Sequence, residues 1–581
     1  MNPLLKIKRA QWSHEQIVLL ALGVVVGVLG GYGAVGFRWL ITFVREFCYG
    51  PGEDFLELLS GQTWYYRLWV PLAGGLVVGP LIYFLAREAK GHGVPEVMEA
   101  VSLRGGLIRK RVVVVKSLAS AVSIAVGASV GREGPIVQIG SAIGSTVAQI
   151  LKLSANRMRV LVGCGAAAGI AATFNAPVAG MMFALEIILG EFAITTFSPI
   201  VLSAVMATAI SRFYLGDLPA FVVPIYELVS AWEFALYGVL GILAGVVAVA
   251  FATTLYKLED LANSWRFPEY LKTPLAGLML GILGLMFPTV LGVGYEGINL
   301  ALSDQLAWWL LLAVLAVKIL ATSLSLAGGF SGGVFAPSLF MGSMLGGAFG
   351  HMVHAVFPQI TAGPGAYAVV GMAAVVAGAT HGPLSAFLIL FEMTGGYKII
   401  LPLMIGCVVA TLVARQIKEE SIYTLKLIRR GVDIHAGKEM NILRSMTVAQ
   451  AMRNNVESVP QDMTLGRFND KLTHSKHASF PVVNQKNELV GIVSHADYAD
   501  YFLDPNLWDV VVMQDIATEK VVTVTPADTL EDALKKISAK DYATLPVVAG
   551  RADDRRLVGV LSHRDIISAY SRKLRKTHLS A

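Results

Sequence analysis

Arg132 and Glu133 are adjacent ionisable residues inside a long apolar stretch, in the run "GASVGREGPIVQIGSAIG" from Gly127 to Gly144. Ionisable residues within membrane-like segments are energetically costly and are usually functional. Pro135 follows them, and proline is favoured in the first helical turn, where its missing N–H is not needed. The sequence therefore predicts a carboxylate at the start of a helix, next to unsatisfied N–H groups and a partial positive charge.

Two further breaks have the same form. "GHGVPEV" contains Pro95 and "GGVFAP" ends at Pro337, so each predicts another helix start inside apolar sequence. The first N–H groups of a helix bind anions well. Three such starts pointing at one place would form an anion site, and this site would not require a buried lysine.

The composition indicates a membrane protein. Of the 581 residues, 55% are hydrophobic and 15% are charged, whereas soluble domains carry about 25% charged residues. Apolar runs dominate from about residue 16 to 427, and several reach the roughly 20 residues that span a bilayer. The segments around 160–190 and 366–396 are broken by Gly, Asn and Pro, and we expect pieces too short to cross alone.

Charge and cysteine content exclude several classes. The net charge of +6 is dispersed along the chain, so it does not indicate a nucleic-acid partner. The first 15 residues carry Lys6, Lys8 and Arg9 but lack the core of a signal peptide, which predicts a cytoplasmic N-terminus. The three cysteines lie far apart and indicate neither a disulfide framework nor a metal site.

The membrane part is internally repeated. Gly165–Glu186 aligns without a gap on Gly371–Glu392, and one of the earlier breaks precedes each segment. Duplicated halves with interrupted helices are typical of transporters that build a site from discontinuous helices. The predicted fold is an all-α polytopic membrane protein with broken helices and two inverted-topology repeats, roughly 16–215 and 230–430, followed by a cytoplasmic α/β tail.

The tail repeats as well. Phe480–Phe502 parallels Leu545–Tyr570, and each segment holds Pro-Val-Val, a turn and then Ser-His-x-Asp. This tail resembles a tandem pair of CBS domains. The predicted domains are a cytoplasmic N-terminus (1–15), the membrane domain (16–430), a linker (431–444), the CBS pair within 445–575 (445–503 and 511–574) and a short tail (576–581).

The CBS resemblance implies a possible ligand. In CBS pairs that bind ATP or another adenine nucleotide, the aspartate of this motif holds the ribose hydroxyls and the serine lies near the phosphates. The matching residues are Ser494, Asp497, Ser562 and Asp565. Other CBS pairs bind nothing and only assemble dimers, so both interpretations stay open. Transport itself is expected to need no cofactor.

In the membrane part, "GHGVPEV", "GREGP", "NAPVAG", "GGVFAP" and "SIYTLKL" occur in this order. Over residues 15–430 the chain resembles the CLC family of chloride channels and transporters. The resemblance implies a homodimer in a lipid bilayer, with one pathway per subunit for chloride or another small monovalent anion. It implies a gate at Glu133 and anion-binding positions at His92, Gly93, Gly131, Arg132, Val334, Phe335 and Tyr423.

Within this resemblance, Glu133 occupies the site that the anion needs, and its protonation or displacement opens the path.

Two positions depart from the family pattern. His92 stands where most members have serine, which favours an effect on oxyanion selectivity or pH sensitivity. Ile187 follows Glu186 where proton-coupled exchangers have a second, proton-accepting glutamate. We therefore expect a passive channel or uniporter. The alternatives are a proton-coupled exchanger or a transporter selective for bicarbonate or nitrate.

Each of these residues also has a purely structural interpretation. Glu133 could cap its helix, Tyr423 could lie in an interfacial aromatic belt, and His92 could bind a carbonyl. The repeat-related Glu186 and Glu392 are expected to accept hydrogen bonds from backbone donors.

Three other classes of protein fit the sequence less well. A cation transporter would need clustered oxygen ligands, and an enzyme would need convergent catalytic side chains. A nucleotide sensor would need only a simple anchor. A bacterial plasma membrane is the expected location, with both termini cytoplasmic, and an organellar membrane is the alternative.

Overall fold

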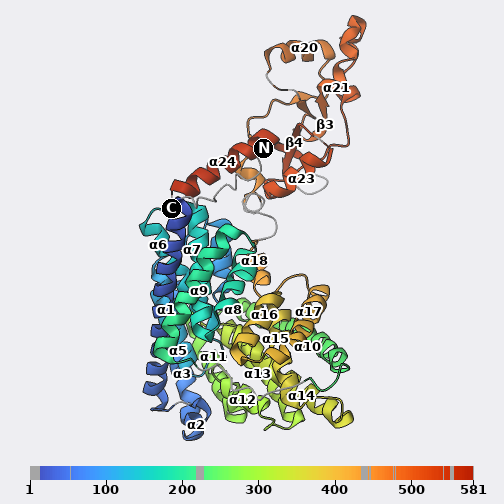
Figure 1. The fold of residues 1–581 in the computed structure, drawn as a ribbon. Coiled ribbons are helices and arrows are strands. Elements are labelled where there is room, and N and C mark those ends of the chain that lie inside the picture. Colours follow the sequence, from blue (N-terminus) through green and yellow to red (C-terminus); the bar gives the residue numbers. More distant parts are fainter. Residues whose placement is uncertain are drawn as a thin grey trace, which may run out of the picture. The chain divides into compact units, whose positions relative to one another are not determined.

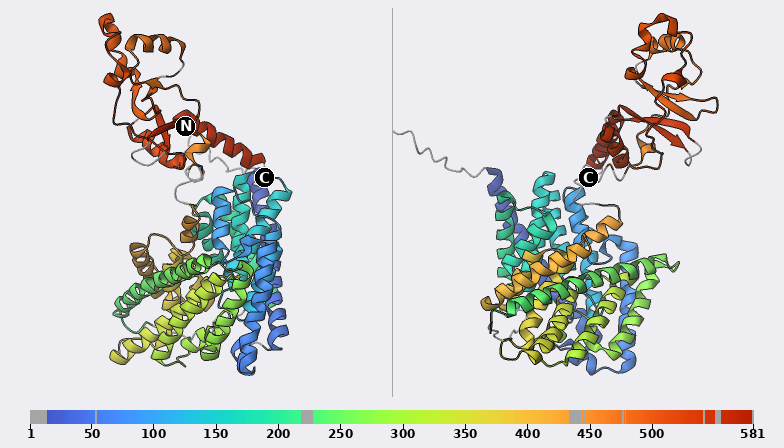
Figure 2. Two further views of the ribbon diagram at one scale, coloured as in Figure 1. Left: turned by 180° about the vertical axis from the view of Figure 1, so that it is seen from behind. Right: turned by 90° about the vertical axis from the view of Figure 1, so that its right-hand side faces the viewer.

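The computed structural model describes residues 14–52, 54–217, 228–432, 443, 446–475, 477, 479–540, 542–549 and 555–579. The chain forms two compact units, Met1–Arg429 and Arg430–Ala581. The first unit is helical, and the second combines short strands with helices (Figures 1 and 2). The predicted N-terminal segment and the 431–444 linker lie largely outside the described residues.

The first half of the helical unit contains α1 (His14–Tyr49), α2 (Phe55–Ser60), α3 (Trp64–Leu85), η1 (Arg87–Ala89), α4 (Val94–Leu103), α5 (Arg111–Ala125), α6 (Glu133–Ile150), α7 (Ala155–Phe174), α8 (Pro177–Phe183), the π-helical η2 (Ala184–Leu189) and α9 (Ile194–Leu215).

The second half contains α10 (Glu233–Ser264), α11 (Glu269–Met286), η3 (Pro288–Val290), α12 (Tyr295–Leu302), α13 (Trp308–Gly328), α14 (Phe335–Val356), α15 (Pro364–Thr380), α16 (Pro383–Thr394), η4 (Tyr397–Ile399), α17 (Ile400–Ile417) and α18 (Thr424–Arg429).

Within the described residues, 8 helices are long and apolar enough to cross a membrane. One of them is α7 (Ala155–Phe174), with 20 residues. The expectation that the segment around 160–190 contains only pieces too short to cross is therefore wrong for α7. The chain breaks only after this helix, where Asn175 takes the left-handed conformation at φ 58° and Pro177 begins α8.

The two halves repeat the same local geometry. Just as α7 ends at left-handed Asn175, α15 ends at left-handed His381 with φ 57°. The helices α6 and α7 pack closely together, as do α14 and α15. A Cβ added at Gly140 would collide with the backbone of α7, and one added at Gly342 would collide with the backbone of α15. Glycine at these equivalent positions therefore lets both helix pairs approach closely.

The second unit contains η5 (Val448–Gln450), β1 (Val459–Pro460), α20 (Leu465–His474), β2 (Ser479–Val483), β3 (Leu489–Ser494), α21 (His495–Tyr498), η6 (Tyr501–Leu503), η7 (Pro505–Leu507), α22 (Met513–Ile516), α23 (Leu530–Lys540), β4 (Thr544–Ala549), β5 (Arg556–Ser562) and α24 (His563–Leu579).

Its strands form two small sheets. One has the order β1-β2-β3, and the other pairs β4 with β5. β2 and β3 are antiparallel with Ser479 opposite Ser494, and β4 and β5 are antiparallel with Thr544 opposite Ser562. Both Ser-His-x-Asp motifs therefore lie where a strand ends and a helix begins, which the sequence repeat predicts.

Candidate functional site

The three predicted breaks meet through their backbones. Gly131 and Gly333 exchange two hydrogen bonds, with N···O distances of 2.8 and 2.6 Å. The N–H of Gly332 donates to the carbonyl of Gly91 at 3.4 Å. The helix starts of α4, α6 and α14, which are far apart in the sequence, are thus joined at one place.

Glu133 is the first residue of α6, and its side chain is buried, with 1% exposed. Its Oε1 accepts a hydrogen bond from the hydroxyl of Tyr295 at 3.0 Å. Its Oε2 accepts a long hydrogen bond of 3.4 Å from the N–H of Ala336, in the first turn of α14. The carboxylate therefore lies at the N-terminal ends of two helices, where negative charge is stabilised.

The other predicted residues of these two breaks surround the carboxylate. Val334 precedes α14 and Phe335 begins it, and both are buried. The Phe335 ring contacts the ring of Phe174, with a centroid distance of 5.6 Å. The guanidinium of Arg132 lies 5.1 Å from the centre of the Tyr295 ring. Arg132 thus contributes positive charge near Glu133 while stacking on the tyrosine that binds the Glu133 carboxylate.

A cavity of about 550 Å³ adjoins this site. Tyr295 and Arg132 both line it, together with Arg38, Arg45 and Glu296. Tyr295 therefore contacts both this cavity and the Glu133 carboxylate. Tyr295 belongs to none of the sequence motifs and was not predicted as a site residue.

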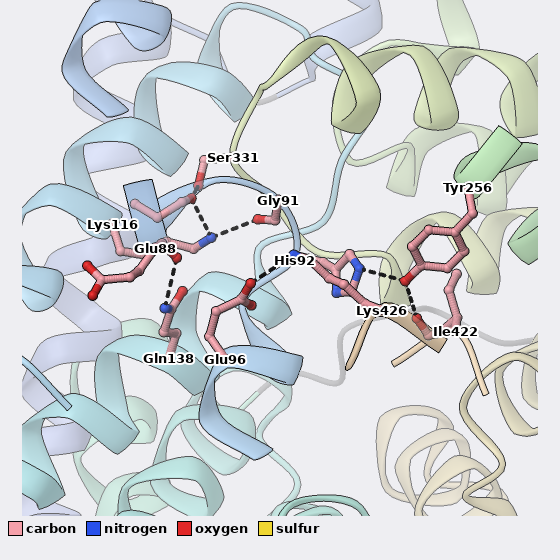
Figure 3. A network of polar contacts seen from close by, with 11 residues as sticks. Glu88, Gly91, His92, Glu96, Lys116, Gln138, Tyr256, Ser331, Ile422 and Lys426 are labelled. Atoms are coloured by element: carbon pink, nitrogen blue, oxygen red, sulfur yellow. Dashed lines mark hydrogen bonds and ion pairs between the residues drawn. The ribbon is translucent and has the colours of Figure 1, made fainter. Parts of the chain in front are cut away.

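At another part of the site, the loop before α4 meets the segment before α18 (Figure 3). Gly93 has φ 83°, a left-handed conformation that suits glycine, and it precedes α4. His92 is 3% exposed and Tyr423 is 1% exposed, and their ring centroids are 5.8 Å apart. Nε2 of His92 lies 3.3 Å from the hydroxyl of Tyr256 on α10, a residue that the sequence analysis missed.

Two buried lysines support the glycine loops. Nζ of Lys116 donates to the carbonyls of Ala89 and Gly91 at 3.0 and 2.8 Å (Figure 3). In the second half, Nζ of Lys318 donates to the carbonyls of two residues before α12, at 2.9 and 3.2 Å. Both side chains are fully buried. Lys116 thus supports the break before α4, and Lys318 supports the loop before α12. The expectation that the anion site requires no buried lysine stays a prediction. The equivalent repeat positions of the two lysines were a signal that the sequence analysis overlooked.

Glu186 and Glu392 form a reciprocal pair of helix caps. The carboxylate of Glu186 accepts from the N–H groups of Leu384 and Ser385 in α16, at 3.2 and 2.7 Å. The carboxylate of Glu392 accepts from the N–H groups of Val178 and Ala179 in α8, at 3.1 and 2.7 Å. The expectation that these glutamates accept hydrogen bonds from backbone donors is confirmed. Ile187, the residue after Glu186, is buried.

In the tail, both serine–aspartate pairs form local hydrogen bonds. The hydroxyls of Ser494 and Ser562 donate to Asp497 and Asp565, each at 2.6 Å. Nε of Arg453 also donates to Oδ1 of Asp565 at 2.7 Å. Burial raises the pKa of Asp565, but the hydrogen bonds from Ser562 and Arg453 outweigh burial and hold the pKa below its usual value. In the part of the chain that the structure describes, no cluster of His, Cys, Asp or Glu could hold a metal ion.

Comparisons with known proteins agree with this architecture. The family model described as voltage gated chloride channel matches residues 74–415, and the CBS domain model matches residues 448–504 and 513–572. A ClcB-like chloride channel protein of Ralstonia nicotianae is 35% identical over 419 residues, covering 71% of this chain and 98% of the relative. The H(+)/Cl(-) exchange transporter ClcA of Salmonella arizonae is 32% identical over 434 residues, covering 72% and 90%. The solved structure of a slow cyanobacterial Cl−/H+ antiporter superposes with a TM-score of 0.65 and 28% identity, covering 71% and 97%.

Proposed function

The chain belongs to the voltage gated chloride channel family and carries two CBS domains, and from this premise we propose that Glu133 gates its transmembrane anion path. The observation that carries the proposal is the position of the Glu133 carboxylate, buried at the N-terminal ends of both α6 and α14. An anion in the same place would receive the same stabilisation. The tethered carboxylate and a mobile anion therefore compete for one site.

Gating follows from this competition. With Glu133 ionised and bound to Tyr295 and Ala336, the site is filled and the path is closed. Protonation removes the negative charge and weakens the attraction to the helix ends. A chloride ion can then take the place of the carboxylate and pass on toward His92 and Tyr423.

We propose passive conduction or uniport over proton-coupled exchange. Two observations support this choice: Ile187 cannot carry a proton, and the Glu186 carboxylate already accepts hydrogen bonds from α16. The relative from Salmonella arizonae is named an H(+)/Cl(-) exchanger, so exchange remains the competing proposal. A second candidate substrate is a small oxyanion such as bicarbonate or nitrate, which is favoured by the imidazole of His92 beside Tyr423.

The test uses the purified full chain in chloride-loaded liposomes, with anion efflux and external pH recorded together. Glu133→Gln is expected to raise efflux and remove its dependence on pH, because the amide cannot ionise. Glu191→Gln changes an exposed glutamate and serves as the matched control. Unchanged efflux and unchanged pH dependence in Glu133→Gln would disprove the gate. Proton movement against its gradient, in fixed ratio to chloride, would establish exchange instead of uniport.

The assembly and the tail complete the proposal. A homodimer with one path per subunit is proposed from the family relationship and is checked by cross-linking in membranes.

For the tail, we propose that an adenine nucleotide binds with its ribose at Asp497. Asp565 already pairs with Arg453, whereas Oδ1 of Asp497 accepts a long hydrogen bond of 3.3 Å from the hydroxyl of Thr518. ATP binding to the full chain should be lost in Asp497→Ala and kept in Asp565→Ala. Absence of binding to the unmodified chain would leave the CBS pair with the alternative role, dimer assembly.

A further inference from the structure

The hydroxyl of Tyr256 joins two loops that lie far apart in the sequence (Figure 3). Tyr256 is on α10 and is 2% exposed. Its hydroxyl lies 2.5 Å from the carbonyl oxygen of Ile422 and 3.3 Å from Nε2 of His92. His92 belongs to the loop before α4, and Ile422 immediately precedes Tyr423. One oxygen atom therefore connects the first glycine break to the segment that carries the central tyrosine.

The chemistry of these groups fixes the direction of both hydrogen bonds. A carbonyl oxygen only accepts, so the single hydroxyl proton of Tyr256 is directed to Ile422. The hydroxyl oxygen can then accept from His92, which requires a proton on Nε2 of the imidazole. The arrangement thus selects the Nε2–H form of the neutral His92 ring and holds the plane of the ring.

Both backbone polar groups of Ile422 form hydrogen bonds. Its N–H donates to the carbonyl of Ala379 at 2.8 Å, and its own carbonyl accepts from Tyr256. The backbone leading into Tyr423 is therefore bound to both α10 and the end of α15. The position of the Tyr423 ring relative to His92, with centroids 5.8 Å apart, depends on these bonds.

The ring of Tyr256 is also contacted by a cationic side chain. The guanidinium of Arg429 on α18 lies 5.3 Å from the ring centre and pairs with Asp260 on α10. One turn earlier in α18, Nζ of Lys426 binds Oε1 of Glu96 on α4 at 2.8 Å. Tyr256 on α10 is thus contacted by Arg429 of α18 and by His92 of the loop before α4.

From this geometry we propose that Tyr256 is a positioning residue that sets the constriction between His92 and Tyr423 and thereby the discrimination between anions of different size. The proposal rests on the proposed anion path past these two residues. Tyr256 acts through His92 and Ile422 and needs no contact with the anion. Removing its hydroxyl releases both loops. The energy barrier to the passage of an anion larger than chloride should therefore fall.

The test compares nitrate and chloride efflux from liposomes that contain the full chain. Tyr256→Phe keeps the ring and is expected to raise the nitrate-to-chloride ratio about three- to tenfold, as expected for a lost hydrogen bond. Tyr237→Phe is the matched control, because Tyr237 is equally buried on the same helix and stacks on Tyr367 at 4.8 Å. A structural defect alone would lower both fluxes and leave their ratio unchanged.

A second variant keeps the test valid if Tyr256→Phe does not fold. Arg429→Gln removes the guanidinium over the Tyr256 ring, leaves His92 intact and should shift the ratio in the same direction. An unchanged ratio in the folded variants, or an equal shift in Tyr237→Phe, would overturn the positioning role.

The pH dependence of efflux, which Glu133→Gln should remove, is measured separately. If Glu133→Gln behaves as expected and the ratio does not move, only the role of Tyr256 fails. If Glu133→Gln has no effect, the gate itself fails.

Discussion

The hydroxyl of Tyr295 donates a hydrogen bond to Oε1 of Glu133 over 3.0 Å, although 162 positions separate the two residues in the sequence. Tyr295 also lines the cavity of about 550 Å³ next to the site. It therefore holds the carboxylate in place from the side of this cavity. The guanidinium of Arg132 stacks on the same ring.

Tyr295→Phe should make the closed gate less stable. Loss of one hydrogen bond to a buried carboxylate is expected to increase anion efflux at neutral pH by about three- to tenfold. Tyr397→Phe, at an exposed tyrosine, is the control. Efflux is measured in liposomes over a pH series. An efflux rate equal to that of the unmodified chain at every pH would mean that Tyr295 contributes nothing to closure.

Glu186→Gln and Glu392→Gln should each lower stability more than they change transport. Each glutamate accepts two backbone N–H bonds at the start of the other repeat's short helix. An amide accepts these bonds more weakly, and the cost should be about 1–2 kcal/mol of unfolding free energy. Thermal unfolding in detergent checks this, with the exposed Glu419→Gln as control. A normal melting temperature combined with altered proton movement would instead assign Glu186 to transport.

Lys116→Met and Lys318→Met should have similar effects, because the two lysines occupy equivalent positions in the repeats. Each substitution leaves two buried carbonyl oxygens without their ammonium donor. The expected loss is about 2–4 kcal/mol per site. Lys110→Met, at an exposed position before α5, is the control. The yield of folded protein and its melting temperature report the effect, and a variant as stable as the control would contradict the supporting role.

The tail should lose stability in acid. Burial raises the pKa of Asp528, but hydrogen bonds from Thr525 and the charge of Lys536 outweigh burial, and the net shift is downward from 3.8, as for Asp565. Folded pKa values below the unfolded values mean that the ionised carboxylates stabilise the fold fully above about pH 5 and lose this effect as the pH falls through 3.8 and below. Pepsin cleavage of the full chain within residues 446–579 should therefore increase as the pH falls.

The matched variant for this acid effect is Asp528→Asn combined with Asp565→Asn. Neither amide titrates, so the dependence of cleavage on pH should become shallower than in the unmodified chain. An equally steep dependence in the double variant would show that other groups cause the acid sensitivity.

Much of the local structure around the site could be predicted from the sequence alone. Glycine and proline act on their own backbone, so the starts of α4, α6 and α14 followed from local rules. Glu133 was already assigned to a helix N-terminus for the same reason. The internal repeat also predicted that Glu186 and Glu392 share a role, since equivalent positions in two copies of one fold have equivalent neighbours.

Tertiary structure alone decided which side chains meet at the site. Tyr295 reaches Glu133, and Tyr256 reaches His92, across more than 160 positions of sequence. Neither tyrosine belongs to a motif, and a tyrosine in an apolar helix is equally compatible with lipid contact or core packing. Their hydrogen bonds depend on the register and crossing of helices that pack through space. These are properties of the whole bundle, because each helix is positioned by all of its neighbours together.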